Sequence, residues 1–281
     1  MRLDLVDVFG SGPMRGNPLA VVHDAVGLSD RQMLELTLWL GFSETTFLLP
    51  PTDPAADYRV RIFYPGGELP FAGHPTLGTC HAWLEGGGQP RDARPVVQEC
   101  GVGLVEIGRE GDLLAFRAPE LTRYGPLDDA ERAEAARIAG VAEAQVVEAV
   151  HVANGPGWKM LRLASAEEVL AAEPVSRAPK GTDVGLVGPH PAGSESAWEL
   201  RAFFANMQGQ VGEDPVTGSF NAGVAMHLFG SGLEKGSYLA SQGRKVGADG
   251  HVHCRQEADG SVWIGGRTGT IARGAALPTF V

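Results

Sequence analysis

One stretch of the chain has a second copy further along, and this duplication restricts the possible folds more than any other feature of the sequence. The first copy begins at Glu68 with ELPFAGHPTLG, and the second begins at Glu213 with EDPVTGSFNAG. In both copies the Glu is followed by Pro two residues later, by Gly five residues later and by Gly ten residues later. A repeat of this length predicts two similar domains that face each other.

Each copy of the motif is preceded by an Arg-x-Phe run and followed by a segment of small and apolar residues. The runs are Arg61-Ile62-Phe63 and Arg201-Ala202-Phe203, and the apolar segments cover residues 74–85 and 218–229. Both segments are predicted helices, and a helix without a polar face has to be surrounded by protein. We therefore expect each helix to be enclosed by strands of its own half.

The starts of these two helices are candidate binding sites. His74 and Ser219 occupy equivalent positions there, directly after Gly73 and Gly218. A helix N-terminus offers unpaired N–H groups and about half a positive charge, which suits a carboxylate or an enolate. Glycine allows a ligand to approach the backbone closely. Two such helix starts converging on one cleft would bind a small acid without any arginine.

Composition and charge restrict the class of protein. The 281 residues are 43% apolar, which is enough to bury one or two cores. The net charge of −11 and the lack of a basic run argue against nucleic acid and anionic membrane surfaces as partners. The start of the chain resembles a strand rather than a signal peptide, and we expect a soluble cytoplasmic protein. Three cysteines without CxxC spacing favour neither a disulfide scaffold nor a metal site, and we expect no metal.

The rest of the chain alternates strands and helices in two halves. Ser29, with Gln32 three residues later, forms a capping box for a helix that ends at Gly41. Further helices are expected near residues 129–139 and after Ser165. Strands are expected near residues 3–9, 17–22, 42–49, 58–64, 96–107, 112–117, 145–150, 158–163, 183–187, 197–204, 236–240, 244–254 and 261–266.

A Pro-containing connector with little periodicity, residues 118–128, is typical of a domain boundary. We predict an N-terminal domain of residues 1–122 and a C-terminal domain of residues 123–269. The last strand, residues 270–281, is expected to return to the N-terminal domain.

The side chains near the motifs are those that proton transfer at carbon requires. Glu44, His74, Asp214 and Ser219 could together remove a proton from carbon and return it elsewhere. Each also has a structural interpretation. Glu44 could be a solvent-facing strand residue, His74 and Ser219 helix caps, and Asp214 a turn residue. The same holds for Asn17, which precedes a proline and is typical of a turn.

Four motifs in this order resemble the PhzF-like phenazine-biosynthesis family. They are Asp7-Val-Phe9 with Arg15-Gly-Asn-Pro-Leu19, Ser43-Glu-Thr-Thr-Phe47, Glu68 to Gly78, and Glu213 to Ser219. The resemblance implies an α/β (α+β) fold shared with diaminopimelate epimerase and proline racemase. That fold has two pseudo-symmetric domains, each a mixed β-sheet or barrel curled around a central helix, with the active site between them. It also implies a homodimer and no cofactor.

The same resemblance assigns the roles of the site residues. The racemase relatives carry a cysteine directly before the helix-start glycine in each half, where this sequence has Ala72 and Thr217. Two-thiol racemisation is therefore excluded. Glu44 corresponds to the general acid/base of the phenazine enzyme. His74, Asp214 and Ser219 correspond to residues that bind and orient its substrate, and we add Asn17, Gly73 and Gly218 as candidate contacts.

The sequence thus predicts an isomerase that moves a proton, without a cofactor, on a small carboxylate-bearing substrate, either cyclic or open-chain. Two alternatives stay open: a non-catalytic protein that binds small acids or partners on the same scaffold, and an epimerase that uses Glu44 and another acid in place of thiols. Hydrolysis through Ser219 is disfavoured because the GxSxG motif is absent. Phe220, where the family commonly has a smaller residue, is large enough to narrow the cleft.

Overall fold

The computed structural model describes residues 1–91 and 95–278 and divides the chain into two compact units. Unit 1 contains Met1–Arg117 and the chain from Gly265 onward, and unit 2 contains Ala118–Ile264. These divisions lie a few residues before the boundaries expected at 122 and 269. The end of the expected last strand, residues 279–281, lies outside the described residues. No helix in the described ranges is long and apolar enough to cross a membrane.

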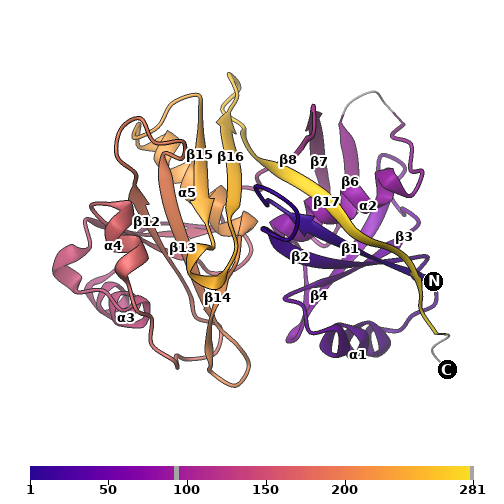
Figure 1. Ribbon diagram of the computed structural model, residues 1–281, viewed down its shortest axis with the longest axis horizontal. Helices are drawn as coiled ribbons and strands as arrows, with labels where there is room; N and C mark the ends of the chain where they lie inside the picture. The colour runs from indigo at the N-terminus through magenta and orange to yellow at the C-terminus, as the bar shows by residue number, and fades with distance from the viewer. Residues whose placement is uncertain (92–94, 279–281) are drawn as a thin grey trace. The chain divides into compact units, whose positions relative to one another are not determined.

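Unit 1 is a closed barrel of eight strands. Each strand pairs with the next around the ring, in the order β1, β2, β3, β4, β6, β7, β8 and β17, and β17 pairs with β1 to close it. The strands are β1 (Arg2–Val8), β2 (Asn17–His23), β3 (Thr45–Leu49), β4 (Tyr58–Tyr64), β6 (Val96–Cys100), β7 (Gly103–Glu110), β8 (Leu113–Arg117) and β17 (Val262–Ala276). The C-terminal strand β17, yellow in Figure 1, therefore closes the barrel beside β1.

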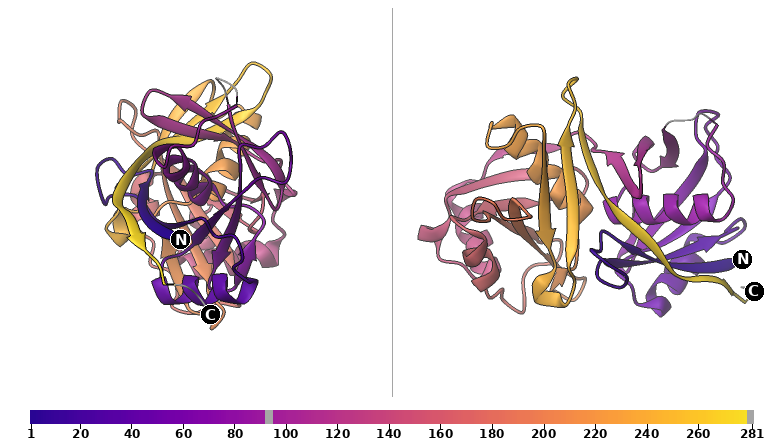
Figure 2. Two further views of the ribbon diagram at one scale, coloured as in Figure 1. Left: turned by 90° about the vertical axis from the view of Figure 1, so that its right-hand side faces the viewer. Right: turned by 45° about the horizontal axis from the view of Figure 1, so that its top comes forward.

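Helix α2 (Gly73–Glu85) fills this barrel, as its composition predicts. It contacts β1, β2, β3, β6 and β8, and the left view of Figure 2 shows strands around it on all sides. Helix α1 (Asp30–Leu40) packs outside, on β3 and β4. The predicted capping box of Ser29 and Gln32 is present, and Gly41 ends α1 in the left-handed conformation, with φ of 75°.

Unit 2 repeats this plan. Strands β9, β10, β11, β12, β13, β15 and β16 pair in that order, and helix α5 packs on β10 and β16. Helices α3 and α4 pack on β11, β12 and β13. The elements are β9 (Arg123–Pro126), α3 (Asp129–Ala139), η1 (Glu143–Gln145), β10 (Glu148–Ala153), β11 (Lys159–Arg162), α4 (Ala166–Ala171), β12 (Asp183–Pro189), β13 (Trp198–Ala205), α5 (Gly218–Gly230), β15 (Ser237–Gln242), η2 (Arg244–Val246) and β16 (Gly250–Gln256).

The repeated motif forms the same hairpin in both units. In unit 1, β4 pairs with the short β5 (Gly67–Leu69), and in unit 2, β13 pairs with β14 (Val211–Asp214). The Glu that starts each motif lies opposite the Phe of the Arg-x-Phe run and is bonded to its Arg: Arg61 Nε donates to Glu68 at 2.8 Å, and Arg201 Nη2 donates to Glu213 at 2.8 Å. Both carboxylates therefore stabilise the loop before a central helix.

A second glycine in each motif lets the central helix approach its strands. A Cβ atom on Gly78 would lie 2.5 Å from the Leu19 side chain, and one on Gly223 would lie 2.3 Å from the carbonyl oxygen of Val152. Real Cβ atoms do not come this close. A larger residue at Gly223 would therefore push α5 away from the backbone of β10, and one at Gly78 would displace the Leu19 and Val8 side chains that pack on α2. The shared glycines are thus explained by packing.

Several sequence predictions were wrong in detail. The strand expected over residues 96–107 is a hairpin of β6 and β7, because Gly103 turns the chain with φ of 104°. The connector over residues 118–128, for which no strand was expected, contains β9, which pairs with β10. The strand expected over residues 244–254 starts only at Gly250, after η2. Alternation continues through a tight turn, so periodicity alone did not reveal the first break.

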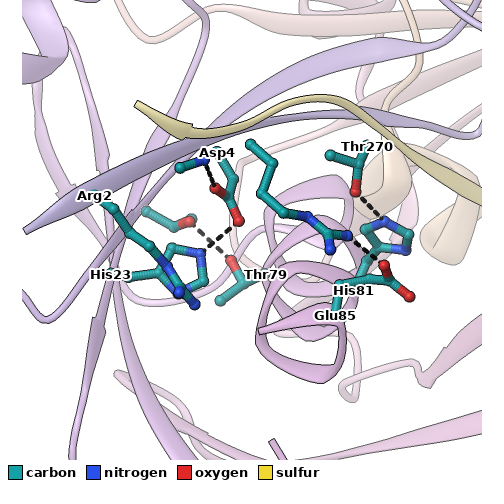
Figure 3. Close-up of polar contacts among 10 residues, drawn as sticks. Arg2, Asp4, His23, Thr79, His81, Glu85 and Thr270 are labelled. Carbon is teal, nitrogen blue, oxygen red and sulfur yellow. Dashed lines mark hydrogen bonds and ion pairs between the residues drawn. The ribbon is translucent and has the colours of Figure 1, made fainter. Parts of the chain in front are cut away.

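Polar contacts fasten β17 to the rest of unit 1 (Figure 3). Asp4 accepts a hydrogen bond from the backbone N–H of Gly274 at 2.7 Å and another from the His23 ring at 2.8 Å. On α2, the two ring nitrogens of His81 contact the hydroxyls of Thr268 and Thr270 at 2.9 and 2.8 Å. These contacts join the last strand to the first strand and to the central helix.

The two Arg–Glu pairs offer a matched test of burial. The side chains of Arg201 and Glu213 are 3% and 7% exposed, whereas those of Arg61 and Glu68 are 17% and 41% exposed. Glu213→Ala leaves a buried guanidinium without its partner and is expected to lower the free energy of unfolding by about 3–5 kcal/mol. Glu68→Ala, at the equivalent but more exposed position, should lower the free energy of unfolding by about 0–1 kcal/mol. Equal losses in urea-induced unfolding would contradict this interpretation.

Candidate active site

Three side chains predicted for the site lie together at one end of the unit 1 barrel. Strands β2 and β3 run parallel, so Asn17 at the start of β2 and Glu44 just before β3 lie at the same end. His74, in the first turn of α2, lies between them. Its Nδ1 is 3.3 Å from the Asn17 amide nitrogen, and its Nε2 is 3.5 Å from Glu44 Oε2. Gly73 is the first residue of the same helix.

Burial sets the protonation state of His74. The ring is 4% exposed, and desolvation lowers its pKa from 6.5 to about 3. The imidazole is therefore neutral at physiological pH. An amide NH₂ group can only donate, so Nδ1 accepts from Asn17 and the single ring proton lies on Nε2. Nε2 lies 3.5 Å from Glu44 Oε2 and makes no hydrogen bond to it.

Asn17 is placed by a loop that another family motif closes. The Asp7 carboxylate accepts hydrogen bonds from the backbone N–H of Gly16 at 2.9 Å and of Arg15 at 3.1 Å. A Cβ atom on Gly16 would lie 2.0 Å from the carbonyl oxygen of Val8, so only glycine fits before Asn17. Asp7 and Gly16 therefore act on the site through the position of Asn17.

Glu44 is placed differently from its prediction. The strand expected to begin at Phe42 begins at Thr45, so Glu44 lies in the segment that enters β3 and its side chain does not follow the alternation of the strand. The side chain is 18% exposed. A carboxylate in this position is partly desolvated and next to a neutral histidine rather than in bulk water.

In unit 2, Asp214 is bound into the loop that starts α5. The Thr217 hydroxyl donates to Asp214 Oδ2 at 2.6 Å, and the Gln242 amide donates to the Asp214 carbonyl at 3.1 Å. Gln242 Oε1 also accepts from the Thr217 backbone N–H at 3.1 Å. Sequence reasoning missed Gln242, since it lies on β15, far from the motif in the chain.

Ser219, the counterpart of His74, accepts two hydrogen bonds from one loop, at its carbonyl oxygen and at its hydroxyl. Asn154 donates to the Ser219 carbonyl oxygen at 3.0 Å, and the Trp158 indole donates to Ser219 Oγ at 3.0 Å. Sequence reasoning did not assign these contacts. A weak signal existed, because Asn154-Gly155-Pro156 is similar to Asn17-Pro18 in the first half.

The two helix starts carry no side-chain caps. The N-cap residues are Ala72 and Thr217, and neither makes a capping hydrogen bond from its side chain. The interpretation of His74 and Ser219 as N-caps is therefore wrong, because both lie inside the first turn.

Phe220 does not narrow a cleft. Its side chain is fully buried inside unit 2, where it packs on the Trp158 ring with centroids 5.2 Å apart and covers Gly185. The structure thus brings Asn17, Glu44, Gly73 and His74 together in one unit. It brings Asp214, Gly218 and Ser219 together in the other. That both groups serve a single substrate stays a prediction.

The thiol chemistry of the racemases has no counterpart at these helix starts, where Ala72 and Thr217 stand. Cys80 is fully buried on α2, and burial raises the pKa of its thiol to about 12. It behaves as a small apolar residue, as expected.

The two units, each with strands around one central helix, define an α/β protein of the diaminopimelate epimerase-like fold. A family model described as phenazine biosynthesis-like protein matches residues 6–274. The chain therefore belongs to the phenazine biosynthesis-like protein family, which confirms the resemblance of the four motifs.

Individual relatives cover almost the whole chain. Antisense-enhancing sequence 1 of Schizosaccharomyces pombe is 34% identical over 97% of both chains. Trans-2,3-dihydro-3-hydroxyanthranilate isomerase of Pseudomonas chlororaphis is 31% identical over 97% of this chain and 98% of its own. The solved structure of a predicted epimerase from Pseudomonas aeruginosa has a TM-score of 0.81 and 28% identity, with 99% of each chain covered. The chain is an enzyme of the isomerase class.

The low pKa of His74 makes stability depend on pH in a defined direction. Below pH 6.5 the unfolded chain binds a proton at this ring, but the folded protein does not until the pH approaches about 3. Between pH 7 and pH 5 this one group should lower the free energy of unfolding by about 2 kcal/mol. His74→Gln should lose that part of the pH dependence. The control His251→Gln, at a ring 23% exposed, should keep it. Parallel curves for His74→Gln and the unchanged protein would refute the assignment.

Burial of Cys80 predicts an unreactive thiol. In the native protein, iodoacetamide at pH 8 should modify the partly buried Cys100 before Cys80 or Cys254, which mass spectrometry would resolve.

Cys80→Ala should keep turnover within about twofold, because a thiol with so high a pKa supplies no thiolate. Loss of turnover in a folded Cys80→Ala variant would restore a thiol mechanism.

Proposed function

We propose that this isomerase transfers a proton between two carbon atoms of a small carboxylate-bearing substrate, cyclic or open-chain, with Glu44 as the single acid/base. As a carboxylate, Glu44 removes an acidic allylic or α proton. As a carboxylic acid, it returns the proton one or more atoms away. The side chain of Glu44 is 18% exposed, and this partly desolvated position supports the double role.

The carrying observation is the contact between Glu44 Oε2 and His74 Nε2 at 3.5 Å. A neutral His74 places no positive charge beside the Glu44 carboxylate, and the 3.5 Å between Nε2 and Oε2 is too long for a hydrogen bond. An ion pair would instead hold Glu44 as a strongly stabilised carboxylate and a weak base. The neutral ring therefore favours general acid/base work.

The remaining residues are proposed to bind the substrate. The backbone N–H groups at Gly73 and Gly218 suit a carboxylate or enolate oxygen, and the side chains of Ser219 and Asp214 suit polar substituents. The relative from Pseudomonas chlororaphis is named for trans-2,3-dihydro-3-hydroxyanthranilate, which has such a carboxylate. That compound is the first substrate to try. A homodimer stays a prediction from the resemblance, and a cytoplasmic location stays a prediction from the sequence.

Replacement of Glu44 tests the mechanism. Glu44→Gln keeps the shape of the side chain but removes the base, so turnover should fall about 10²–10⁴-fold while substrate affinity changes little. The matched control Glu68→Gln alters a carboxylate of the hairpin and should retain turnover. The assay follows trans-2,3-dihydro-3-hydroxyanthranilate by absorbance, and follows a panel of cyclic and amino-acid carboxylates by deuterium uptake from D₂O.

Each outcome of that assay points to one hypothesis. Deuterium uptake that depends on Glu44 supports the proposal, and full turnover by Glu44→Gln ends it. Binding without any exchange would favour a non-catalytic acid binder. Loss of optical rotation in an enantiopure amino acid would favour an epimerase that works without thiols.

A further inference from the structure

The side-chain amide of Gln242 makes four hydrogen bonds around the start of α5. Gln242 is the last residue of β15 and is fully buried. Its Oε1 accepts from the backbone N–H of Thr217 at 3.1 Å and from the Asn221 side-chain amide at 2.8 Å. Its Nε2 donates to the carbonyl oxygen of Asp214 at 3.1 Å and to Thr217 Oγ1 at 2.9 Å. Every donor and acceptor of this amide is therefore used.

The direction of each of these bonds follows from the chemistry of its partners. A backbone N–H can only donate and a carbonyl oxygen can only accept, which fixes the orientation of the Gln242 amide. Thr217 Oγ1 accepts from this amide and lies 2.6 Å from Asp214 Oδ2. A carboxylate has no proton to give, so the hydroxyl hydrogen of Thr217 points to Asp214. Gln242, Thr217 and Asp214 thus form one chain of hydrogen bonds that ends on a carboxylate oxygen.

Unit 1 contains a similar glutamine and threonine without the carboxylate. Gln98 on β6 is also fully buried, and its Nε2 donates to Thr76 Oγ1 at 3.1 Å in the first turn of α2. The Thr76 hydroxyl donates to the carbonyl oxygen of Ala72 at 2.9 Å, which is a bond within the helix start. A glutamine bonded to a threonine at the helix start therefore belongs to the repeated scaffold. The carboxylate at the end of the chain is the addition of unit 2.

We propose that Gln242 is a positioning residue that acts through the Thr217 hydroxyl and fixes the orientation in which the Asp214 carboxylate meets the polar substituents of the substrate. This inference rests on the proposed function, which gives Asp214 that contact. The last torsion of an aspartate side chain is broad, so an unsupported carboxylate samples many orientations. A hydrogen bond to one of its oxygens restricts this rotation before the substrate arrives, which lowers the cost of ordering on binding.

Thr217→Val tests this chain because it removes the hydroxyl and keeps a branched side chain of similar size. Its matched control is Ser241→Ala. Ser241 precedes Gln242 on β15, is buried, and donates to the buried Glu199 carboxylate at the same distance of 2.6 Å. Each change removes one hydroxyl-to-carboxylate hydrogen bond from unit 2, but Ser241→Ala leaves the bond to Asp214 in place. Thr217→Ser, which keeps a hydroxyl, is the conservative variant.

Two ligands report the preference for polar substituents. 2-Amino-3-hydroxybenzoate is the aromatic counterpart of the compound for which the Pseudomonas chlororaphis relative is named, and benzoate has the same carboxylate without the two substituents. Calorimetry of the full chain should show a preference for the substituted ligand that falls about tenfold in Thr217→Val and in Gln242→Met. The preference should be unchanged in Ser241→Ala and retained in Thr217→Ser.

A spectroscopic readout needs no ligand. The side-chain carboxyl ¹³C resonance of Asp214, assigned by its loss in Asp214→Ala, should shift in Thr217→Val and stay in place in Ser241→Ala. A residue that only stabilised the strand would not produce this difference. Adding Thr217→Val to Asp214→Ala should change the affinity for 2-amino-3-hydroxybenzoate no further, because both changes remove one interaction. If trans-2,3-dihydro-3-hydroxyanthranilate is turned over, Thr217→Val should raise KM about tenfold with kcat within twofold.

The results separate this inference from the proposed function. A shifted Asp214 resonance and a lost substituent preference in Thr217→Val support it even if no substrate of the panel exchanges a proton. An unshifted resonance in Thr217→Val, an equal loss of preference in Ser241→Ala, or the absence of any preference in the unchanged protein would overturn it, even if Glu44 proves to be the acid/base. Thr217→Val carries the test by itself if Gln242→Met does not fold.

Discussion

Both units depend on how closely a buried helix can approach the strands that enclose it. Gly78 and Gly223 remove the side chains that would separate α2 from β2 and α5 from β10. The close approach brings the first turn of each helix within hydrogen-bond distance of the asparagine on the neighbouring strand or loop, Asn17 or Asn154. The hydrogen bonds at the helix starts therefore depend on this close packing, since buried polar groups need partners.

Desolvation then determines the chemistry of those groups. His74 is neutral because a charged ring would lose its hydration when buried, and this desolvation lowers its pKa. Ser219 is uncharged by type, and its hydroxyl oxygen accepts a hydrogen bond from the Trp158 indole, which cannot accept. The Glu44 carboxylate lies 3.5 Å from the neutral His74 ring. Proton transfer by one carboxylate fits this environment better than a thiol pair would, because Ala72 and Thr217 occupy the relevant positions.

The duplication preserved the scaffold more strictly than the chemistry. The Arg–Glu pair, the hairpin and the glycine contact recur in both halves. The outer contacts differ: Arg61 also binds Asp30 at the start of α1, whereas Arg201 donates to the carbonyl oxygens of Val169 and Ala172 at the end of α4. The arginine of each pair therefore contacts an outer helix of its unit. In unit 1 it contacts the N-terminal end of α1, and in unit 2 the C-terminal end of α4. The site residues at equivalent positions, His74 and Ser219, diverged in type while the frame around them stayed.

The sequence by itself determined the repeat, the ends of α1 and α3, the buried character of α2 and α5, and the absence of thiols at the helix starts, because caps, composition and motif spacing are local properties. It also pointed to Glu44, His74 and Asn17, although it placed Glu44 within a strand. Only the tertiary structure decided that Trp158 and Gln242 reach the start of α5, and that Phe220 points inward. These contacts join residues far apart in the chain, and no periodic pattern records which side chains meet when strands close around a helix.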